Sequence, residues 1–358
     1  MKKYFLLFII WSSCAIGLVY AQTTAPKYSN EFLNIGVGAR ALGMSNVQVA
    51  SVNDVTAAYW NPAGLLNMKS KHEVALMHSE YFAGIAKYDY GAFATHLDSQ
   101  SVIALSIIRF GVDDIPDTRY LYDANGALNY NNIRYFSAAD YAFLLSYARQ
   151  TKLVPGLQFG ANFKVIHRTV GQFANAWGFG LDAGAQYIRK KWKFGLMARD
   201  VTGTFNAWSH NTALIQDVYA ATGNTIPQNS IEVTLPKVIL GVARQFKMFK
   251  KIGLLTAIDF VNTFDGKRNV LIKSNVVSID PMAGFELDYN QIIFLRFGAG
   301  NIQKIKDFDK GTKTTFQPNF GIGVRISRLY IDYALTDVGN QAEALYSNVF
   351  SLKLALNK

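Results

Sequence analysis

Alternating apolar and small or polar residues recur in short stretches from about residue 72 to the C-terminus. In one stretch, Leu, Phe, Ala, Phe and Val occupy every second position from 157 to 165, with Gln, Gly, Asn and Lys between them. Successive side chains of a strand point to opposite faces, so each stretch predicts a strand with one apolar face. The other faces are small and glycine-rich, which is typical of strands with lipid outside and a crowded lumen inside.

The N-terminus has the parts of a secretory signal peptide. Lys2 and Lys3 precede an apolar segment over residues 4–11, and Val-Tyr-Ala at 19–21 ends in a small residue suited to signal peptidase. We therefore predict a signal peptide over residues 1–21, which takes no part in the fold.

An uncleaved membrane anchor and a lipoprotein are the alternatives to cleavage. The apolar run is short for an anchor and is interrupted by Ser12 and Ser13. A lipoprotein acylated at Cys14 would need an aliphatic residue where Trp11 stands. Because Cys14 is the single cysteine, cleavage would leave a mature chain without disulfides or thiolate metal ligands.

Composition argues against a helical membrane protein and favours a barrel. Aromatic residues make up 14% and charged residues 17% of the chain, and no run of about 18 apolar residues follows the signal. The formal net charge is +11, or +9 once Lys2 and Lys3 are removed (11 − 2). Basic residues at the rims would contact phosphates of outer-membrane lipid or lipopolysaccharide, whereas an exported barrel is a poor candidate for nucleic-acid binding.

Fourteen segments fit the alternating pattern, and bacterial single-chain barrels have an even number of strands. The predicted strands cover residues 71–80, 86–97, 100–110, 138–150, 156–169, 174–188, 191–202, 233–246, 251–263, 276–289, 291–300, 314–327, 328–338 and 345–356. Short links alternate with mostly longer ones, as expected for periplasmic turns and outer loops, and the longest are 111–137 and 203–232. We predict an all-β, transmembrane antiparallel β-barrel over residues 71–358, with twelve strands as the alternative.

The outward faces of these strands are predicted to be apolar and aromatic. Phe159 and Leu181 should face lipid, and Trp177, Trp192 and Tyr330 should belong to the aromatic girdles at the membrane surfaces. A soluble β-sandwich or propeller is the alternative. It is disfavoured because packed soluble sheets do not need aromatic residues on their outward faces.

Residues 22–70 do not alternate cleanly. Asn53 or Asp54 is placed to cap a short helix, Pro62 would force the preceding residue out of helical geometry, and Gly64 would permit a left-handed turn. On these grounds alone the segment predicts a short helix with a sharp end.

Two motifs in this segment resemble a known family. Gly-Val-Gly-Ala-Arg-Ala-Leu-Gly-Met at 36–44 and Trp-Asn-Pro-Ala-Gly at 60–64, between a signal peptide and a barrel, resemble the PorV/PorQ family, which is related to the FadL-like outer-membrane barrels. The resemblance extends over essentially the whole chain. It implies that residues 22–70 form a small N-terminal hatch folded into the barrel. The motif residues of this hatch are Arg40, Asn61, Pro62, Ala63 and Gly64.

The resemblance also implies a function in the outer membrane of a Gram-negative, Bacteroidetes-like bacterium. PorV-like barrels associate with the translocon of the type IX secretion system and receive secreted cargo, and PorQ-like barrels anchor a surface protein of the attachment complex. The expected partners are therefore translocon or attachment-complex proteins and their cargo. The alternative is a FadL-like transporter of hydrophobic small molecules.

No catalytic constellation is present in the sequence. The five histidines include no His-Glu-x-x-His pair, and no Gly-x-Ser-x-Gly elbow occurs. We therefore expect no enzymatic activity, no metal and no cofactor.

The two functions place different demands on the outer loops and the wall. A secretion partner would use exposed anchors, and Trp208 and Tyr219 in the link 203–232 are the candidates, unless this link folds into the mouth as a lid. A transporter would need a lumen pocket and a lateral gap, which glycines or Pro236 within a strand would create.

Overall fold

The computed structural model describes residues 29–226, 229–306, 311–336 and 347–356. The predicted signal peptide 1–21 and residues 22–28 lie outside the described residues. Among the described helices, none is both long and apolar enough to cross a membrane.

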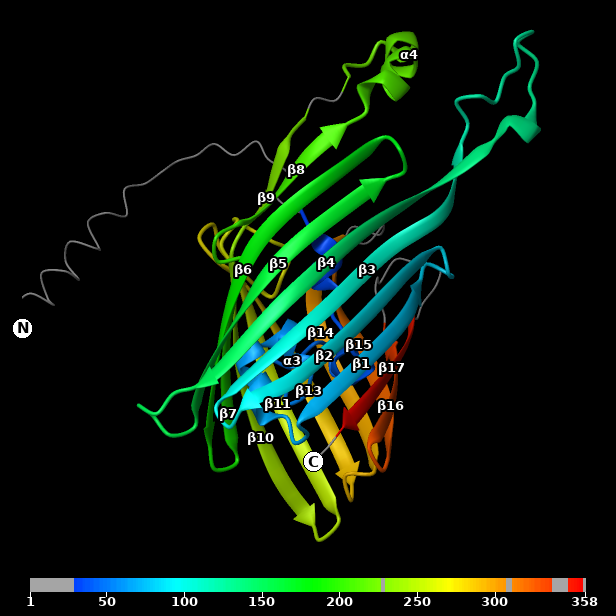
Figure 1. Ribbon diagram of the computed structural model, residues 1–358. Coiled ribbons are helices and arrows are strands. Elements are labelled where there is room, and N and C mark those ends of the chain that lie inside the picture. Colours follow the sequence, from blue (N-terminus) through cyan, green and yellow to red (C-terminus); the bar gives the residue numbers. More distant parts are fainter. Residues whose placement is uncertain (1–28, 227–228, 307–310, 337–346, 357–358) are drawn as a thin grey trace, which may run out of the picture.

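Antiparallel strands make up most of the described chain (Figure 1). They are β1 (His72–Tyr81), β2 (Ala86–Asp98), β3 (Ser101–Asp117), β4 (Arg134–Gln150), β5 (Leu157–Val170), β6 (Ala174–Arg189), β7 (Trp192–Arg199), β8 (Thr204–His210), β9 (Ile231–Thr234), β10 (Lys237–Phe249), β11 (Ile252–Thr263), β12 (Ile272–Lys273), β13 (Ser278–Tyr289), β14 (Ile293–Lys306), β15 (Thr312–Ile326), β16 (Leu329–Thr336) and β17 (Ser347–Leu356). The helical segments are η1 (Glu31–Asn34), α2 (Ala39–Leu42), α3 (Ala57–Trp60), η2 (Pro62–Asn67), η3 (Tyr130–Asn132) and α4 (Thr212–Thr222).

The strands close into a barrel because β1 pairs with both β2 and β17. β7 and β8 pair with successive parts of β6 and together form one interrupted wall strand. β10 pairs with β7 and β9 pairs with β8, so β9 and β10 together form the next interrupted wall strand. With the two-residue β12 set aside, the described strands make fourteen wall strands. The fourteen-strand prediction is confirmed, and twelve is excluded.

The inside and outside faces follow the sequence alternation. Phe159 and Leu181 are 49% and 43% exposed on the outer surface, whereas Gln158 is 7% exposed and faces the lumen. Trp177 and Trp192 also lie on the outside. The prediction for Tyr330 is wrong: its ring lies inside the barrel, 4.2 Å from the Lys353 ammonium, because its strand neighbour Ile331 takes the outward position.

The two longest links are more structured than predicted. β3 and β4 keep pairing as far as Asp117 and Arg134, so a hairpin arm projects from the barrel where a loop over 111–137 was expected (Figure 1). The link 203–232 likewise contains β8, α4 and β9. Pairing continues in both places because the backbone groups find partners on the neighbouring strand.

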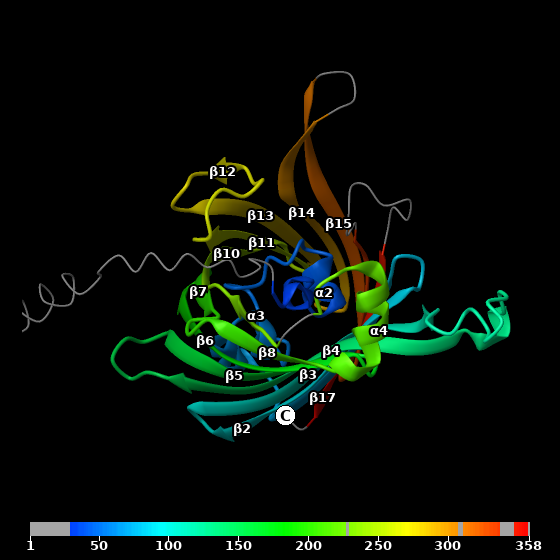
Figure 2. The same ribbon diagram turned by 90° about the horizontal axis from the view of Figure 1, so that it is seen from above.

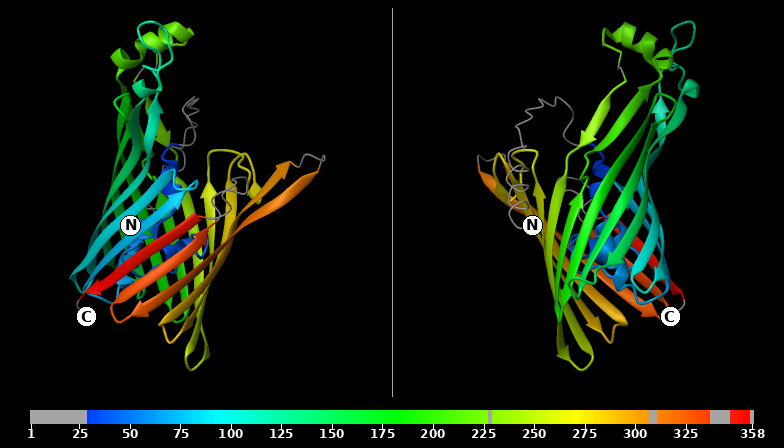
Figure 3. Two further views of the ribbon diagram at one scale, coloured as in Figure 1. Left: turned by 90° about the vertical axis from the view of Figure 1, so that its right-hand side faces the viewer. Right: turned by 60° about the vertical axis from the view of Figure 1, so that its left-hand side comes forward.

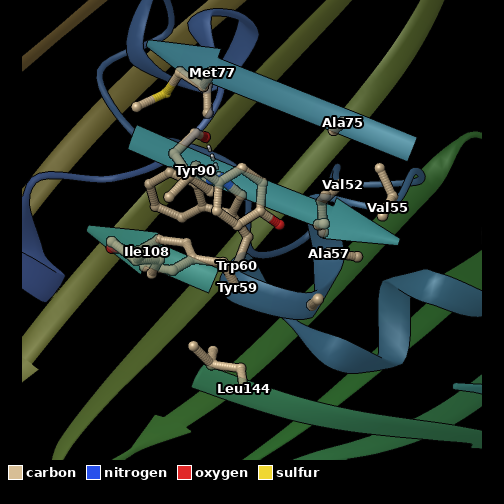
Figure 4. Close-up of a cluster of buried hydrophobic side chains, with 14 of the residues drawn as sticks. Val52, Val55, Ala57, Tyr59, Trp60, Ala75, Met77, Tyr90, Ile108 and Leu144 are labelled. Carbon is tan, nitrogen blue, oxygen red and sulfur yellow. Dashed lines mark hydrogen bonds between the residues drawn. The ribbon is translucent and has the colours of Figure 1, made fainter. Parts of the chain in front are cut away.

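Residues 29–70, the described part of the hatch, lie inside the barrel (Figure 2). Their short helices pack against the wall on several sides, and the largest apolar cluster forms between the hatch and β1–β4. In this cluster, Tyr59 and Trp60 of the hatch lie beside Tyr90, Ile108 and Leu144 of the wall (Figure 4). Side views show the hatch enclosed by strands on both sides, with the short turns and the end of β17 at the same end of the barrel (Figure 3). That end is the periplasmic one.

Candidate functional site

Asn61 joins the hatch to the barrel wall. Its backbone is extended (φ −163°) because Pro62 follows, and Pro62 opens the 3₁₀ helix η2. The side-chain amide of Asn61 donates to the backbone oxygens of Val49 and Ala185, at 2.9 and 3.0 Å, and its oxygen accepts from the amide of Ala63 at 3.2 Å. The hatch turn is thereby hydrogen-bonded to β6 and to itself.

Glycines on the inner faces of the strands let this turn approach the wall. A Cβ on Gly160 would lie 2.5 Å from the backbone of Pro62 and Ala63, and one on Gly184 would lie 2.2 Å from Oδ1 of Asn61. A Cβ on Gly64 would lie 2.7 Å from the backbone oxygen of Val52. Gly64 is needed for this close approach and not for a left-handed turn, since it lies within η2 without a positive φ.

The hatch helix α3 begins without the predicted side-chain cap. Its N-cap is Thr56, and Asp54 instead accepts from the amide and hydroxyl of Thr56 at 3.0 and 2.6 Å. The carboxylate of Asp54 also receives the Lys353 ammonium from β17 at 2.6 Å. Burial alone would raise the pKa of Asp54, but the charges of Lys353 and Arg40 outweigh it and hold this pKa well below its usual range.

Arg40 anchors the hatch to the opposite wall. Its guanidinium donates from Nε and Nη2 to both oxygens of Glu286 on β13, at 2.8 and 3.0 Å, and from Nη1 to Asn53 at 3.0 Å. Arg296 donates to the same carboxylate at 2.7 Å. Although burial opposes the charged form, the Glu286 carboxylate raises the pKa of Arg40, which stays a cation.

Two neighbouring wall strands are interrupted at the same height. The β7–β10 ladder ends at Arg199 with Lys237, and the β8–β9 ladder resumes at Thr204 with Thr234. Residues 200–203 form a turn with positive φ at Asp200 and Gly203, and Leu235–Pro236 separates the other two strands. The positive-φ turn interrupts one strand, and Pro236, which has no N–H to donate to a ladder, interrupts the other. The sequences of both strands therefore specify the break.

The start of the hatch lies behind this break. The amide of Asn30 donates to the hydroxyl of Thr234 at 2.9 Å, and Asn206 donates to Asn30 Oδ1 at 2.9 Å. Arg199 donates to the backbone oxygen of Leu33, and Lys237 hydrogen-bonds to Asn34. Small cavities of about 20 and 30 Å³ flank these contacts, so the break is filled by the hatch and by polar side chains.

A buried ion cluster supports the turn at the break. The Lys164 ammonium contacts Asp182 at 2.7 Å and Asp200 at 2.5 Å, and Asp182 also accepts from the backbone amide of Asp200 at 2.9 Å. The sequence analysis missed this cluster. Lys164 and Asp182 lie on the small, inward faces of neighbouring predicted strands, where an unpaired charge is costly. Their pairing could have been predicted from the sequence on this ground.

The two predicted loop anchors occupy structured positions. Trp208 is not in a loop but in β8, opposite Ala176, and the guanidinium of Arg168 lies 5.1 Å from its ring centre. Tyr219 is half-buried on α4. Within the described residues no group of three or more His, Cys, Asp or Glu side chains could hold a metal ion.

Comparisons with solved structures match the whole barrel. The chain aligns with the toluene transporter TbuX of Ralstonia pickettii at 13% identity, covering 89% of this chain and 98% of TbuX, with a TM-score of 0.52. The monoaromatic hydrocarbon channel CymD (12% identity, 90% and 98% covered) and the P. putida toluene transporter TodX (12%, 90% and 99%) each give a TM-score of 0.53.

The fold is the fourteen-stranded antiparallel barrel with an N-terminal segment inside it that these transporters and channels share. At these identities the likeness shows the fold alone. No family model matches the chain, and no curated protein matches it. The resemblance to the PorV/PorQ family therefore remains a prediction from the two hatch motifs.

Proposed function

We propose that this barrel passes small hydrophobic molecules across the outer membrane by a lateral route through the wall break. The observation that carries the proposal is the coincidence of two interruptions in adjacent strands, at 200–203 and 235–236, with the start of the hatch directly behind them. The whole-chain likeness to channels described as carrying toluene and other monoaromatic hydrocarbons supports it.

The start of the hatch is the part that would have to move to open such a route. Residues 29–34 make no ion pair to the wall among the described residues: they are held by hydrogen bonds of Ser29 and Asn30 to β8 and β9, each with a net contribution of about 0.5–1.5 kcal/mol, and by the burial of Phe32 and Leu33. The rest of the hatch is held by ion pairs to β13 and β17 and by close packing on wall glycines. Displacement of residues 29–34 would therefore expose the break while the remaining hatch blocks direct flow to the periplasm.

A reversible cross-link tests this route. Asn30→Cys/Thr234→Cys places two thiols where a 2.9 Å hydrogen bond now ties the hatch to β9. We expect the oxidised variant to take up a fluorescent naphthylamine probe more slowly than the reduced one in whole cells. The matched control is Ala207→Cys/Ile231→Cys, which bridges a ladder pair of the same two strands at exposed positions without a contact to the hatch. Equal uptake by oxidised and reduced Asn30→Cys/Thr234→Cys would count against the lateral route.

A second candidate function is that of a PorV/PorQ-type partner in type IX secretion. It is favoured by the hairpin arm of β3 and β4, which projects beyond the barrel, and by the two hatch motifs. Arg119 at the arm donates to the backbone oxygen of Leu214 on α4 at 2.6 Å, so arm and helix form one outer feature. Tyr122 and Tyr130 are 66% and 69% exposed on it, and aromatic anchors dominate most protein interfaces.

Co-purification tests the second candidate. We expect Trp208→Ala/Tyr219→Ala to assemble as a barrel, because the wall is closed by its own strands, and to lose a large secretion partner if these residues dock it. Tyr122→Ala/Tyr130→Ala tests the arm separately, since Trp208 also packs under Arg168. Retained co-purification in both variants, together with lost uptake in the cross-linked variant above, would favour transport.

A further inference from the structure

A polar cavity of about 590 Å³ lies between the hatch and the periplasmic ends of the strands. Arg40 of the hatch, Lys69 at the end of the hatch and Lys193 of β7 line it, together with Lys250–Lys251 of the β10–β11 turn. We call it the periplasmic vestibule. It is within the size range of sites that hold small ligands, which is about 300–1,000 Å³.

Cations outnumber anions in the vestibule. Eight Lys and Arg side chains line it, against four Asp and Glu side chains. Two of the carboxylates are already paired with arginines. Glu286 forms ion pairs with Arg40 and Arg296, and Asp332 pairs with Nη1 of Arg296 at 2.7 Å. Lys353 is neutralised by Asp54 of the hatch.

Five lysines of the vestibule remain without a counter-charge. Within the described chain, no carboxylate oxygen lies within 4.0 Å of the ammonium groups of Lys69, Lys193, Lys247, Lys250 or Lys251. Lys193 is half-buried and the other four are exposed, and all five line the same cavity as Arg40. Like charges around one partly enclosed cavity repel one another more strongly than in open water, and a bound anion would relieve this repulsion.

We propose that the periplasmic vestibule binds a small soluble polyanion that carries two or more phosphate or carboxylate groups. Lysine and arginine are the usual partners of these oxyanions. The unpaired lysines come from the hatch end, β7, β10 and the β10–β11 turn, so a molecule with several anionic groups reaches more of them than a single ion does. The site faces the periplasm and is separate from the wall break, so it is independent of the transport route proposed above.

Binding of inorganic pyrophosphate to the mature barrel in phosphatidylcholine nanodiscs tests the proposal. Isothermal titration at constant ionic strength should show saturable binding. Lys69→Gln/Lys193→Gln removes two unpaired cations and leaves no carboxylate without its partner. We expect this variant to fold, as judged by heat-modifiable electrophoretic mobility, and to bind pyrophosphate about tenfold or more weakly.

Lys190→Gln/Lys191→Gln is the matched control, because both lysines lie in the β6–β7 turn close to Lys193 and do not line the vestibule, and their replacement removes the same charge. Its affinity should stay within about twofold of the wild type. No saturable binding by the wild type, or equal weakening in the two double variants, would overturn the proposal.

A second arm distinguishes soluble anions from lipid headgroups. Nanodiscs that also contain phosphatidylglycerol offer the same phosphate chemistry from the membrane. Unchanged pyrophosphate affinity in these discs supports a soluble ligand. Loss of pyrophosphate binding there would show that headgroups occupy the vestibule, which would overturn the assignment to a soluble anion.

Discussion

At the scale of single residues, the hatch is fitted to the wall by small side chains and by charge. Gly160, Gly184 and Gly195 remove the atoms that would keep the hatch backbone away from β5, β6 and β7. Arg40 then adds a bidentate contact to the opposite side of the barrel. Both kinds of contact depend on geometry to within fractions of an ångström, so single substitutions should have measurable effects.

Gly195→Ala should loosen the hatch. The added Cβ would lie 2.3 Å from the backbone oxygen of Val49, and neither backbone can move without disturbing the ladder. We expect a loss of about 1–3 kcal/mol in the free energy of unfolding, measured by urea titration in detergent. Gly311→Ala is the control, since nothing lies within 4 Å of its Cβ position. Equal stability of the two variants would contradict the close approach.

Arg40→Gln should weaken the same assembly from the other side. It leaves Glu286 with Arg296 as its single charged partner, and we expect a loss of about 1–3 kcal/mol in unfolding free energy. The double variant Arg40→Gln/Glu286→Gln should recover part of this loss, which a double-mutant cycle measures. Additive effects of the two substitutions would mean that the pair is not coupled.

Asp54 should make the hatch sensitive to acid. Its pKa is lower in the folded protein than its ordinary value of 3.8, so its contribution to stability is present above that value and is lost as the pH falls below it. We expect the protection of the hatch amides from hydrogen exchange, relative to the intrinsic rate at each pH, to fall below about pH 4. Asp54→Asn should be less stable at neutral pH and should flatten this dependence; an unchanged acid profile would rule out Asp54 as the cause.

At the scale of elements, each strand of the wall separates lipid from a packed interior. β5 and β6 pair residue by residue, with Phe163 opposite Leu181 on the lipid side and Asn162 opposite Asp182 on the lumen side. A strand that shifted by one position would exchange these two faces completely. The inner face is therefore as strongly specified as the outer one.

Leu181→Arg should impair assembly of the barrel. An arginine on the lipid face costs about 2–4 kcal/mol at the middle of the bilayer, and heat-modifiable mobility after refolding into liposomes measures the assembled fraction. The control is Leu153→Arg, because Leu153 is 92% exposed in the β4–β5 turn. If Leu181→Arg assembled as well as Leu153→Arg, Leu181 would not face lipid.

At the scale of the whole molecule, the hatch and the barrel divide two tasks. Apart from the wall break, the fourteen strands pair with one another in a closed sheet, so most of the wall does not depend on the hatch for its backbone hydrogen bonds. The hatch fills the lumen and contacts opposite sides of it through Arg40, Asn61 and Asp54. Its removal should therefore open the barrel without unfolding it.

Deletion of residues 22–70 should raise the ion conductance of the protein in planar bilayers. The signal peptide is kept for export, and the full-length mature chain is the reference. The deleted variant should still show heat-modifiable mobility, which verifies that the barrel has assembled. An assembled variant with unchanged conductance would mean that wall side chains or outer loops block the lumen.

The sequence by itself determined the wall of this protein. Alternation of period two is a local property of each strand. It specified the number of wall strands and the outward position of Phe159 and Leu181, but not the continuation of two wall strands as β8 and β9. The alternation did not predict the face of a residue whose type suits both the lipid surface and the lumen. Tyr330 suited a girdle by composition but lies inside, because its register relative to Ile331 decides its face.

The tertiary structure alone decided the contacts between segments far apart in the chain. Glu286 and Lys353 lie 246 and 299 positions after their hatch partners Arg40 and Asp54, and no local pattern connects them. The wall break and the periplasmic vestibule likewise arise only when the barrel closes and brings distant polar side chains together. The alternation within one strand is read from neighbouring residues, whereas these contacts depend on the three-dimensional path of the whole chain.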